Sequence, residues 1–281
     1  MSGGGARGFL GRHGLAPSKE LGQNFLCDDS LAEKLVRLAE VGENDGVLEI
    51  GTGIGILTCA LARRARAITT IEIDAGLVRA LSADASLPAN VRLLHADALE
   101  VDLDAEITTL AAGGSPVRIV ANLPYSVGTP LMRRILDLAP RLAGWSVMLQ
   151  REVAARISAT PRTSDYGSFA VLHQLVARVK VGLVLNPQCF YPAPGVVSSF
   201  ALLTPRTDAA LRPGELAAVE RLVRAAFAHR RKTLVNSLRG HGQIDSAPVA
   251  AWLTQEGLDA RIRAEVLAPD QWLALARELA R

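Results

Sequence analysis

Residues 46–55 read GVLEIGTGIG. The apolar run before the first glycine predicts a short buried strand, and residues 56–65 predict the helix that follows it. Glycines in such a turn let the backbone bend sharply and let a ligand approach closely, which makes Gly51 and Gly53 candidate cofactor-binding residues. The alternative is a tight strand-to-helix turn that binds no ligand.

The spacing of this turn is GxGxG, which differs from the GxGxxG of dinucleotide-binding proteins. Glu49 lies just before the first glycine, whereas a pyrophosphate group needs a helix N-terminus without an adjacent carboxylate. An acid at this position instead suits a ligand that carries an ammonium or sulfonium group. The turn therefore favours such a ligand over a dinucleotide.

Further acids follow the next predicted strands. Glu72 lies near the end of strand 67–73, where a carboxylate accepts hydrogen bonds from ribose hydroxyls in open parallel sheets. Asp97 follows strand 91–94, where it could accept from an exocyclic amine such as N6 of adenine. Either acid alone is more often a helix cap or a solvated carboxylate. Together with Glu49, they predict a nucleoside pocket with a sulfonium end, and hence S-adenosylmethionine and not NAD.

The alternation of strands and helices sets the fold class. Residues 117–120 and 146–149 predict further strands, and this pattern indicates an α/β fold with a mostly parallel sheet covered on both faces. Residues 180–185 and 196–203 are strand-like with no helix between them, which predicts an antiparallel hairpin at the sheet edge. Residues 214–281 carry helical spacing only, so we expect a small all-helical C-terminal domain.

The net charge of +3 comes from the last quarter of the chain. Residues 206–281 carry 12 basic and 9 acidic side chains of the 31 and 28 in the chain, which leaves 19 of each before them. Proline-containing linker sequence marks the same division. We therefore predict a cofactor-binding domain over residues 19–205 and a helical domain over 206–281, whose basic excess permits an RNA-binding role. The glycine-rich start of the sequence predicts a disordered tail over residues 1–18.

Several classes of protein are disfavoured by composition. No apolar run approaches the ~18 residues of a membrane span, and the N-terminus lacks the apolar stretch of a signal peptide. The cysteines, Cys27, Cys59 and Cys189, form no CxxC pair, which argues against a disulfide framework or a structural zinc site. We expect a cytoplasmic protein without a metal and without a membrane partner.

The segment Asn122-Leu123-Pro124-Tyr125 follows the fourth predicted strand. The side-chain oxygen of Asn122 and the carbonyl of Leu123 can both accept from an exocyclic amine, which frees the nitrogen lone pair for methylation. Pro124 fixes the turn that aims these acceptors, and Tyr125 can stack on the base. The alternative is an ordinary turn with a buried tyrosine. Downstream of the acids, the segment favours a methyltransferase for an aminopurine or aminopyrimidine.

Features beyond this segment suggest contacts with RNA. Phe190 lies in a proline-rich loop that offers aromatic surface, although it could also be a core residue. The densest basic run contains Arg230, Arg231 and Lys232, which we expect to contact phosphates, the alternative being a solvated helix face.

The order and spacing of these motifs resemble the KsgA family of rRNA adenine dimethyltransferases over nearly the whole chain. The shared motifs are LGQNFL at 21–26, EIGTGIGILT at 49–58, IEID at 71–74, DAL at 97–99, NLPY at 122–125, LQREV at 149–153, DYG at 165–167, FYPAP at 190–194 and RRKTL at 230–234. The resemblance implies a class I, Rossmann-like, S-adenosylmethionine-dependent methyltransferase fold. It further implies a monomer that dimethylates two adjacent adenines at N6, in the hairpin loop near the 3′ end of 16S rRNA in the immature small ribosomal subunit.

The resemblance also implies roles for individual residues. Cofactor contacts would come from Asn24, Leu26, Gly51, Glu72, Asp97 and Asn122. Asn24 and Leu26 would form a flap over the cofactor and target base, and Phe190 would stack opposite Tyr125.

The sequence departs from the family pattern in places and leaves other functions open. Thr52 stands where proline is typical, which is expected to loosen the glycine turn, and Gly195 and Val197 stand where a lysine and an acid are common. One alternative function is a large-subunit rRNA adenine methyltransferase of the macrolide-resistance type, against which the segments at 165–169 and 226–234 speak. Another is a non-catalytic RNA-binding assembly factor, against which the intact acids and Asn122 speak.

Overall fold

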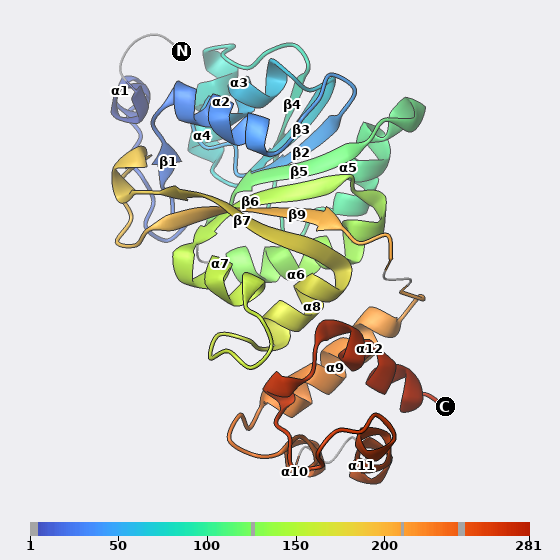
Figure 1. Ribbon diagram of the computed structural model, residues 1–281. Helices are drawn as coiled ribbons and strands as arrows, with labels where there is room; N and C mark the ends of the chain where they lie inside the picture. The colour runs from blue at the N-terminus through green and yellow to red at the C-terminus, as the bar shows by residue number, and fades with distance from the viewer. Residues whose placement is uncertain (1–4, 125–126, 209–210, 241–244) are drawn as a thin grey trace. The chain divides into compact units, whose positions relative to one another are not determined.

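A seven-stranded sheet forms the centre of the computed structural model, which describes residues 5–124, 127–208, 211–240 and 245–281. The strand order is β4-β3-β2-β5-β6-β9-β7 (Figure 1). The strand bounds are β2 Gly46–Ile50, β3 Ala67–Glu72, β4 Val91–His95, β5 Val117–Asn122, β6 Gly144–Gln150, β7 Ala177–Leu185 and β9 Ser198–Pro205. Strands β4, β3, β2, β5 and β6 pair in parallel, and β9 pairs antiparallel with β6. The mostly parallel sheet with an antiparallel edge confirms the predicted fold class.

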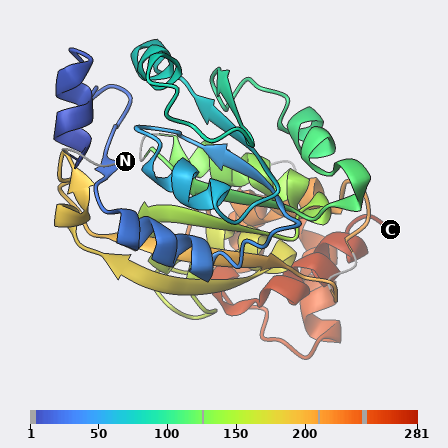
Figure 2. The ribbon, with the colours of Figure 1, turned by 90° about the horizontal axis from the view of Figure 1, so that it is seen from above.

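Helices cover both faces of this sheet (Figures 1 and 2). Every residue of β2 is buried, as expected for a parallel strand between two helical layers. The α-helices that accompany these strands are α2 Asp29–Leu38, α3 Ile56–Ala62, α4 Ala75–Ala83, α5 Leu103–Leu110, α6 Gly128–Leu138 and α7 Arg151–Ser158, with 3-10 turns η1 Ala112–Gly114, η2 Ala139–Arg141 and η3 Pro187–Cys189. Asp74 caps α4, because its carboxylate accepts from the amides of Gly76 and Leu77.

The chain divides into two units by its internal contacts. The first comprises Met1–Ala154 and Lys180–Pro205, and the second comprises Ala155–Val179 and Arg206–Arg281. Unlike the predicted domains, the second unit takes in residues 155–179, because α8, Ser168–Val176, packs against the C-terminal helices. The apolar residues of 155–179 can pack in either unit, so their pattern in the sequence does not place the boundary.

The second unit is helical, as the spacing predicts. Its C-terminal elements are α9 Glu215–Phe227, α10 Leu234–Arg239, α11 Ser246–Gln255, the 3-10 turn η4 Ala264–Val266 and α12 Pro269–Glu278. Tyr166 and Trp272 are fully buried in its core, and the Tyr166 hydroxyl donates to the carbonyl of Leu267 over 2.8 Å. The guanidinium of Arg277 hydrogen-bonds Glu215 and lowers the pKa of that carboxyl to about 2.

Part of the segment 1–18, which was expected to be disordered, is a helix, and residues 1–4 of that segment lie outside the described residues. Gly5–Arg12 form helix α1, whose Phe9 and Leu10 are buried in the hydrophobic core of the first unit. Further along, β1, Phe25–Leu26, pairs antiparallel with β8, Phe190–Tyr191. The sequence did not predict this helix, because it is rich in glycine and has only two large apolar side chains to pack against the core. No helix within the described ranges is long and apolar enough to cross a bilayer.

Candidate active site

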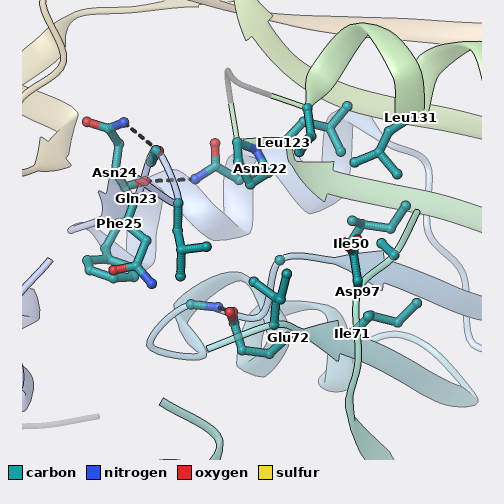
Figure 3. A pocket seen from close by; sticks show the side chains of 18 of the residues that line it. Gln23, Asn24, Phe25, Ile50, Ile71, Glu72, Asp97, Asn122, Leu123 and Leu131 are labelled. Atoms are coloured by element: carbon teal, nitrogen blue, oxygen red, sulfur yellow. Dashed lines mark hydrogen bonds between the residues drawn. The ribbon is translucent and has the colours of Figure 1, made fainter. Parts of the chain in front are cut away.

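A cavity opens at the carboxyl ends of the parallel strands of the first unit (Figure 3). Strands β2 and β5 are neighbours in the sheet, and the chain leaves them toward opposite faces of the sheet. A crevice forms between two strands whose connections diverge in this way. The cavity is lined by Glu20–Phe25, Ile50, Gly51, Gly53, Ile71–Ile73, Ala96–Ala98, Asn122–Pro124, Val127 and Leu131.

Most of the predicted site residues meet in this cavity. It contains Asn24, Gly51, Gly53, Glu72, Asp97, Asn122, Leu123 and Pro124. They come together because parallel strands place their carboxyl ends at one edge of the sheet. Tyr125 lies outside the described residues.

The glycine turn needs glycine because its backbone enters the left-handed region at Gly51, Gly53 and Gly55. Gly51 and Gly53 have φ angles of 85° and 58°, in the left-handed region where side chains are strained. A Cβ atom on Gly53 would also lie 3.1 Å from the ring of Phe25. The ring of Phe25, in the segment 20–25, therefore packs directly against the glycine turn.

Glu72 holds the glycine turn against the end of β3. Its Oε2 accepts from the amide of Gly53 over 2.8 Å, and its Oε1 accepts from the amide of Asp74 over 2.9 Å. Burial raises the pKa of this carboxyl, and the hydrogen bonds from the backbone amides oppose that rise. Each carboxylate oxygen has two lone pairs, so both can still accept from a ligand in the cavity.

Glu49 does not line the cavity, which corrects its predicted contact with a charged ligand. Its side chain is fully buried, and its Oε2 accepts from the hydroxyls of Thr58 and Thr70, each over 2.6 Å. The Thr52 and Thr70 hydroxyls lie 2.7 Å apart. Thr52 is therefore tied to β3 by hydrogen bonds, and this contact opposes the loosening expected from the loss of proline. The GxGxG spacing indicates an acid near the turn but not the direction of its side chain.

Burial raises the pKa of Glu49 to about 8, whereas the ordinary value is 4.5. Between these values the folded chain keeps a proton that the unfolded chain releases, so this carboxyl lowers stability as the pH rises. We predict that Glu49→Gln gains stability relative to the parent between pH 5 and pH 8, by roughly 1 kcal/mol per pH unit because one proton is involved. Urea unfolding at several pH values measures the difference.

The control for this prediction is Glu43→Gln, which makes the same change at an exposed side chain. Its effect on the free energy of unfolding should stay below about 0.5 kcal/mol, as for most surface substitutions. A Glu49→Gln variant whose difference from the parent does not change with pH would show that Glu49 is ionised in the folded protein.

Asn122 faces the segment that covers the cavity. Its Nδ2 donates to the backbone carbonyl of Asn24 over 3.0 Å (Figure 3). This contact orients the amide, so Oδ1 is the atom left to accept from a ligand. No described residue donates to Oδ1. An acceptor that is fixed in direction and open to the cavity is what polarisation of an amine requires.

The segment 20–26 is held in place at several points, some of which the sequence did not predict. Gln23 donates through Nε2 to Asp74 over 2.8 Å and accepts from the amide of Ser18 over 2.7 Å. Phe25 lies against Gly53, as described above. Leu26, by contrast, is buried away from the cavity and pairs with Phe190. Of the two predicted flap residues, the structure therefore places Asn24 at the cavity and Leu26 outside it.

Phe190 is buried in the hydrophobic core and does not line the cavity. The pairing of β1 with β8 turns its ring inward, which is the core alternative that the sequence left open. The structure therefore does not bring it to the position of a base-stacking residue.

Apolar and acidic groups alternate around the cavity. Ile73 lines the cavity beside Glu72 and remains 44% exposed, so it offers an apolar surface to a flat ring. Asp97 uses Oδ1 to accept from the amide of Leu99 over 2.8 Å. A nucleoside needs this combination of an apolar face and hydrogen-bond acceptors, so the residues present fit S-adenosylmethionine. No group of metal-binding side chains occurs within the described ranges.

The predicted RNA-binding residues lie in the second unit, outside the cavity. Arg230 donates to the carbonyls of Ser164 and Tyr166, over 2.6 and 2.9 Å, and so holds that segment in place. Arg231 and Lys232 are exposed, and no carboxylate in the described part of the chain pairs with them. Phosphate binding thus stays a prediction for all three residues, and Arg230 in addition has a structural role.

Comparisons with known sequences find relatives that cover nearly the whole chain. A family model described as Ribosomal RNA adenine dimethylase matches residues 16–281. Ribosomal RNA small subunit methyltransferase A from Magnetococcus marinus is 40% identical, over 95% of this chain and 94% of that protein. The protein of the same name from Geobacillus sp. strain WCH70 is 36% identical, over 97% of this chain and 95% of that protein.

Solved structures share the fold. A dimethyladenosine transferase from Plasmodium falciparum superposes with a TM-score of 0.73 at 22% identity, over 89% of this chain and 95% of that one. The 23S rRNA methyltransferase ErmE superposes with a TM-score of 0.66 at 26% identity, over 92% of this chain and all of that one.

Proposed function

Because the chain belongs to the ribosomal RNA adenine dimethylase family, we propose that it methylates two adjacent adenines at N6 in 16S rRNA of the immature small ribosomal subunit. The methyl donor is S-adenosylmethionine. The observation that carries this proposal is that Glu72, Asp97 and the open Oδ1 of Asn122 meet in one cavity. We further propose that the protein is a monomer and that it acts in the cytoplasm, where small subunits mature.

The cofactor would be held by groups on three strand ends. Glu72 accepts from the ribose hydroxyls, Asp97 accepts from the exocyclic amine of the adenine ring, and Ile73 covers a face of that ring. Gly51 and Gly53 let the backbone approach the ligand. S-adenosylmethionine, when bound, supplies a methyl group on a positively charged sulfur.

Asn122 and Leu123 act on the target base. The exocyclic nitrogen of adenine is a weak nucleophile, because its lone pair is delocalised into the ring. Hydrogen bonds from this amine to Asn122 Oδ1 and to the Leu123 carbonyl favour a tetrahedral nitrogen with a localised lone pair. An amine held in this way by Asn122 and Leu123 would be placed to take the methyl group that the bound donor supplies, and its surplus proton would pass to water. The reaction needs positioning more than a strong base, and positioning can supply ~7–11 kcal/mol of the barrier reduction.

Relatives favour the small-subunit substrate over the large-subunit one. ErmE shares the fold, so the architecture alone does not separate the two substrates. The similar curated proteins at 36–40% identity are named for the small subunit. A non-catalytic role is disfavoured by the complete set of acceptors in the cavity.

The test is methyl transfer from labelled S-adenosylmethionine to ribosomal subunits that lack the modification. We expect label in 16S rRNA, and mass spectrometry of its 3′ fragment should show two dimethyladenosines. Label found only in 23S rRNA would contradict the proposal in favour of the large-subunit enzyme. Tight binding to small subunits without any transfer would instead support the assembly factor.

A further inference from the structure

A second hollow lies beside the candidate active site, in the same unit. Its volume is about 540 Å³, and it is lined by Pro17–Lys19, Gly22–Asn24, Gln150, Tyr191, Pro192 and Pro194–Val196. Gly22–Asn24 also line the first cavity, so this segment forms a wall shared by both. Asn122 and Leu123, the acceptors for the target amine, line only the first cavity. A ligand in the hollow is therefore close to the target base but distinct from it.

The hollow has an aromatic wall. Tyr191 is half-buried at its side, and the guanidinium of Arg7 lies 5.1 Å from the centre of its ring. Arg7 is not among the residues that line the hollow, whereas Tyr191 is. Pro192 and Pro194 restrict the backbone that carries the ring. Every nucleic-acid base can stack on such a ring, whatever its identity.

The charge and polar groups of the hollow suit a nucleotide. Lys19 lines it and is exposed, and the lining contains no acidic residue. No carboxylate in the described part of the chain lies within ion-pair distance of Lys19 or Arg7. Gln150 and Asn24 add polar groups that can meet the edge of a base. An aromatic platform beside unpaired cations is typical of sites for single-stranded nucleic acid.

We propose that this hollow binds the base of a nucleotide adjacent to the target adenosine, stacked on Tyr191 with a phosphate beside Lys19. The inference rests on the proposed function, since it assigns a subsite for the same RNA. Segment 22–24 then separates the two bases, with the target on the Asn122 side and its neighbour on the Tyr191 side. This arrangement holds the strand splayed, which presents one adenine at a time to the acceptors.

The test pairs protein variants with altered oligonucleotides. The probe is a fluorescent four-nucleotide oligoadenylate RNA, and its affinity is measured with S-adenosylhomocysteine present so that no transfer occurs. Tyr191→Leu should weaken binding about 5- to 100-fold, the range expected for loss of one stacked base. An abasic residue at one position of the oligonucleotide should weaken its binding to the parent protein by the same factor. For that abasic oligonucleotide, Tyr191→Leu should cause no further loss of affinity.

Matched variants separate stacking from charge and from folding. Tyr191→Phe keeps the aromatic face and should bind like the parent. Lys19→Gln should reduce the slope of log affinity against log salt by about 0.7, the value for one phosphate contact of a single strand. Lys34→Gln, at an exposed lysine on α2 away from the hollow, should leave that slope unchanged. Unchanged affinity for S-adenosylhomocysteine shows that each variant is folded.

The proposal is overturned if the parent protein binds the intact and all abasic oligonucleotides alike, including no detectable binding of any. It is also overturned if Tyr191→Leu lowers affinity by the same factor for every oligonucleotide. Methyl transfer to small subunits is measured in parallel with the parent protein. Absence of that transfer counts against the proposed function, whereas transfer without the position-dependent coupling counts against this subsite alone.

Discussion

Replacing Asn122 by alanine is expected to lower the turnover number about 100- to 1,000-fold, the cost of removing one well-placed hydrogen-bonding group from a reacting centre. The reason is that Oδ1 is held open to the cavity by the contact of Nδ2 with Asn24. The dissociation constant of S-adenosylhomocysteine should change by less than about fivefold, because one neutral hydrogen bond contributes roughly 1 kcal/mol. Single-turnover methylation of small subunits and calorimetric titration measure the two quantities.

Two further variants make this prediction specific. Asn122→Asp keeps an acceptor oxygen but loses the donor to Asn24, so it should retain more turnover than the alanine variant. Asn44→Ala, at an exposed position near the opposite end of β2, should leave both quantities unchanged. If Asn122→Ala loses cofactor affinity together with turnover, then Asn122 supports the cavity and does not act on the target amine.

Local patterns predicted the sheet and most of the cavity. Apolar runs mark the parallel strands, and the position of each polar group just after a strand is enough to place it at a common edge. Glu72, Asp97 and Asn122 meet for this reason, although 50 residues separate Glu72 from Asn122. The positions of these residues just after their strands were therefore enough to predict that they lie close together.

What the sequence did not predict depends on contacts between distant segments. The pairing of β1 with β8 joins residues 25–26 to residues 190–191, and no local periodicity marks so short a pair. That pairing buries Phe190 and Leu26, which were expected at the site. Arg230 likewise contacts backbone carbonyls of a segment far away in sequence, which a run of basic residues does not reveal.

Glu49 illustrates a different limit. The acid before the glycine turn was predicted to contact the ligand, and that prediction is wrong, because whether its side chain points to the cavity or to the core depends on its neighbours. Thr58 on α3 and Thr70 on β3 supply hydroxyls within the core, and they hold the carboxyl there. Burial among hydrogen-bond donors of this kind is a tertiary property, which is why the acid was assigned to the ligand.

Replacing Glu72 by alanine is expected to weaken binding of S-adenosylhomocysteine by about 100-fold or more. Glu72 accepts from the amides of Gly53 and Asp74, so its loss removes the hydrogen bond that holds the Gly53 end of the glycine turn against β3. It also removes the proposed acceptor for two ribose hydroxyls, and hydrogen bonds to a charged group contribute about 1.5–3 kcal/mol each. Calorimetric titration measures the affinity, and thermal unfolding shows whether the variant stays folded.

Glu72→Gln separates the two contributions of this carboxylate. The amide has nearly the same shape, but its NH₂ must face either the Gly53 or the Asp74 amide, and two donors cannot form a hydrogen bond. We therefore expect an intermediate loss of affinity with the glutamine variant, together with a small loss of stability. Glu43→Ala, at an exposed site, should change neither quantity. If both Glu72 variants bind S-adenosylhomocysteine as tightly as the parent, the ribose does not contact Glu72 and the assignment of this cavity to the cofactor is wrong.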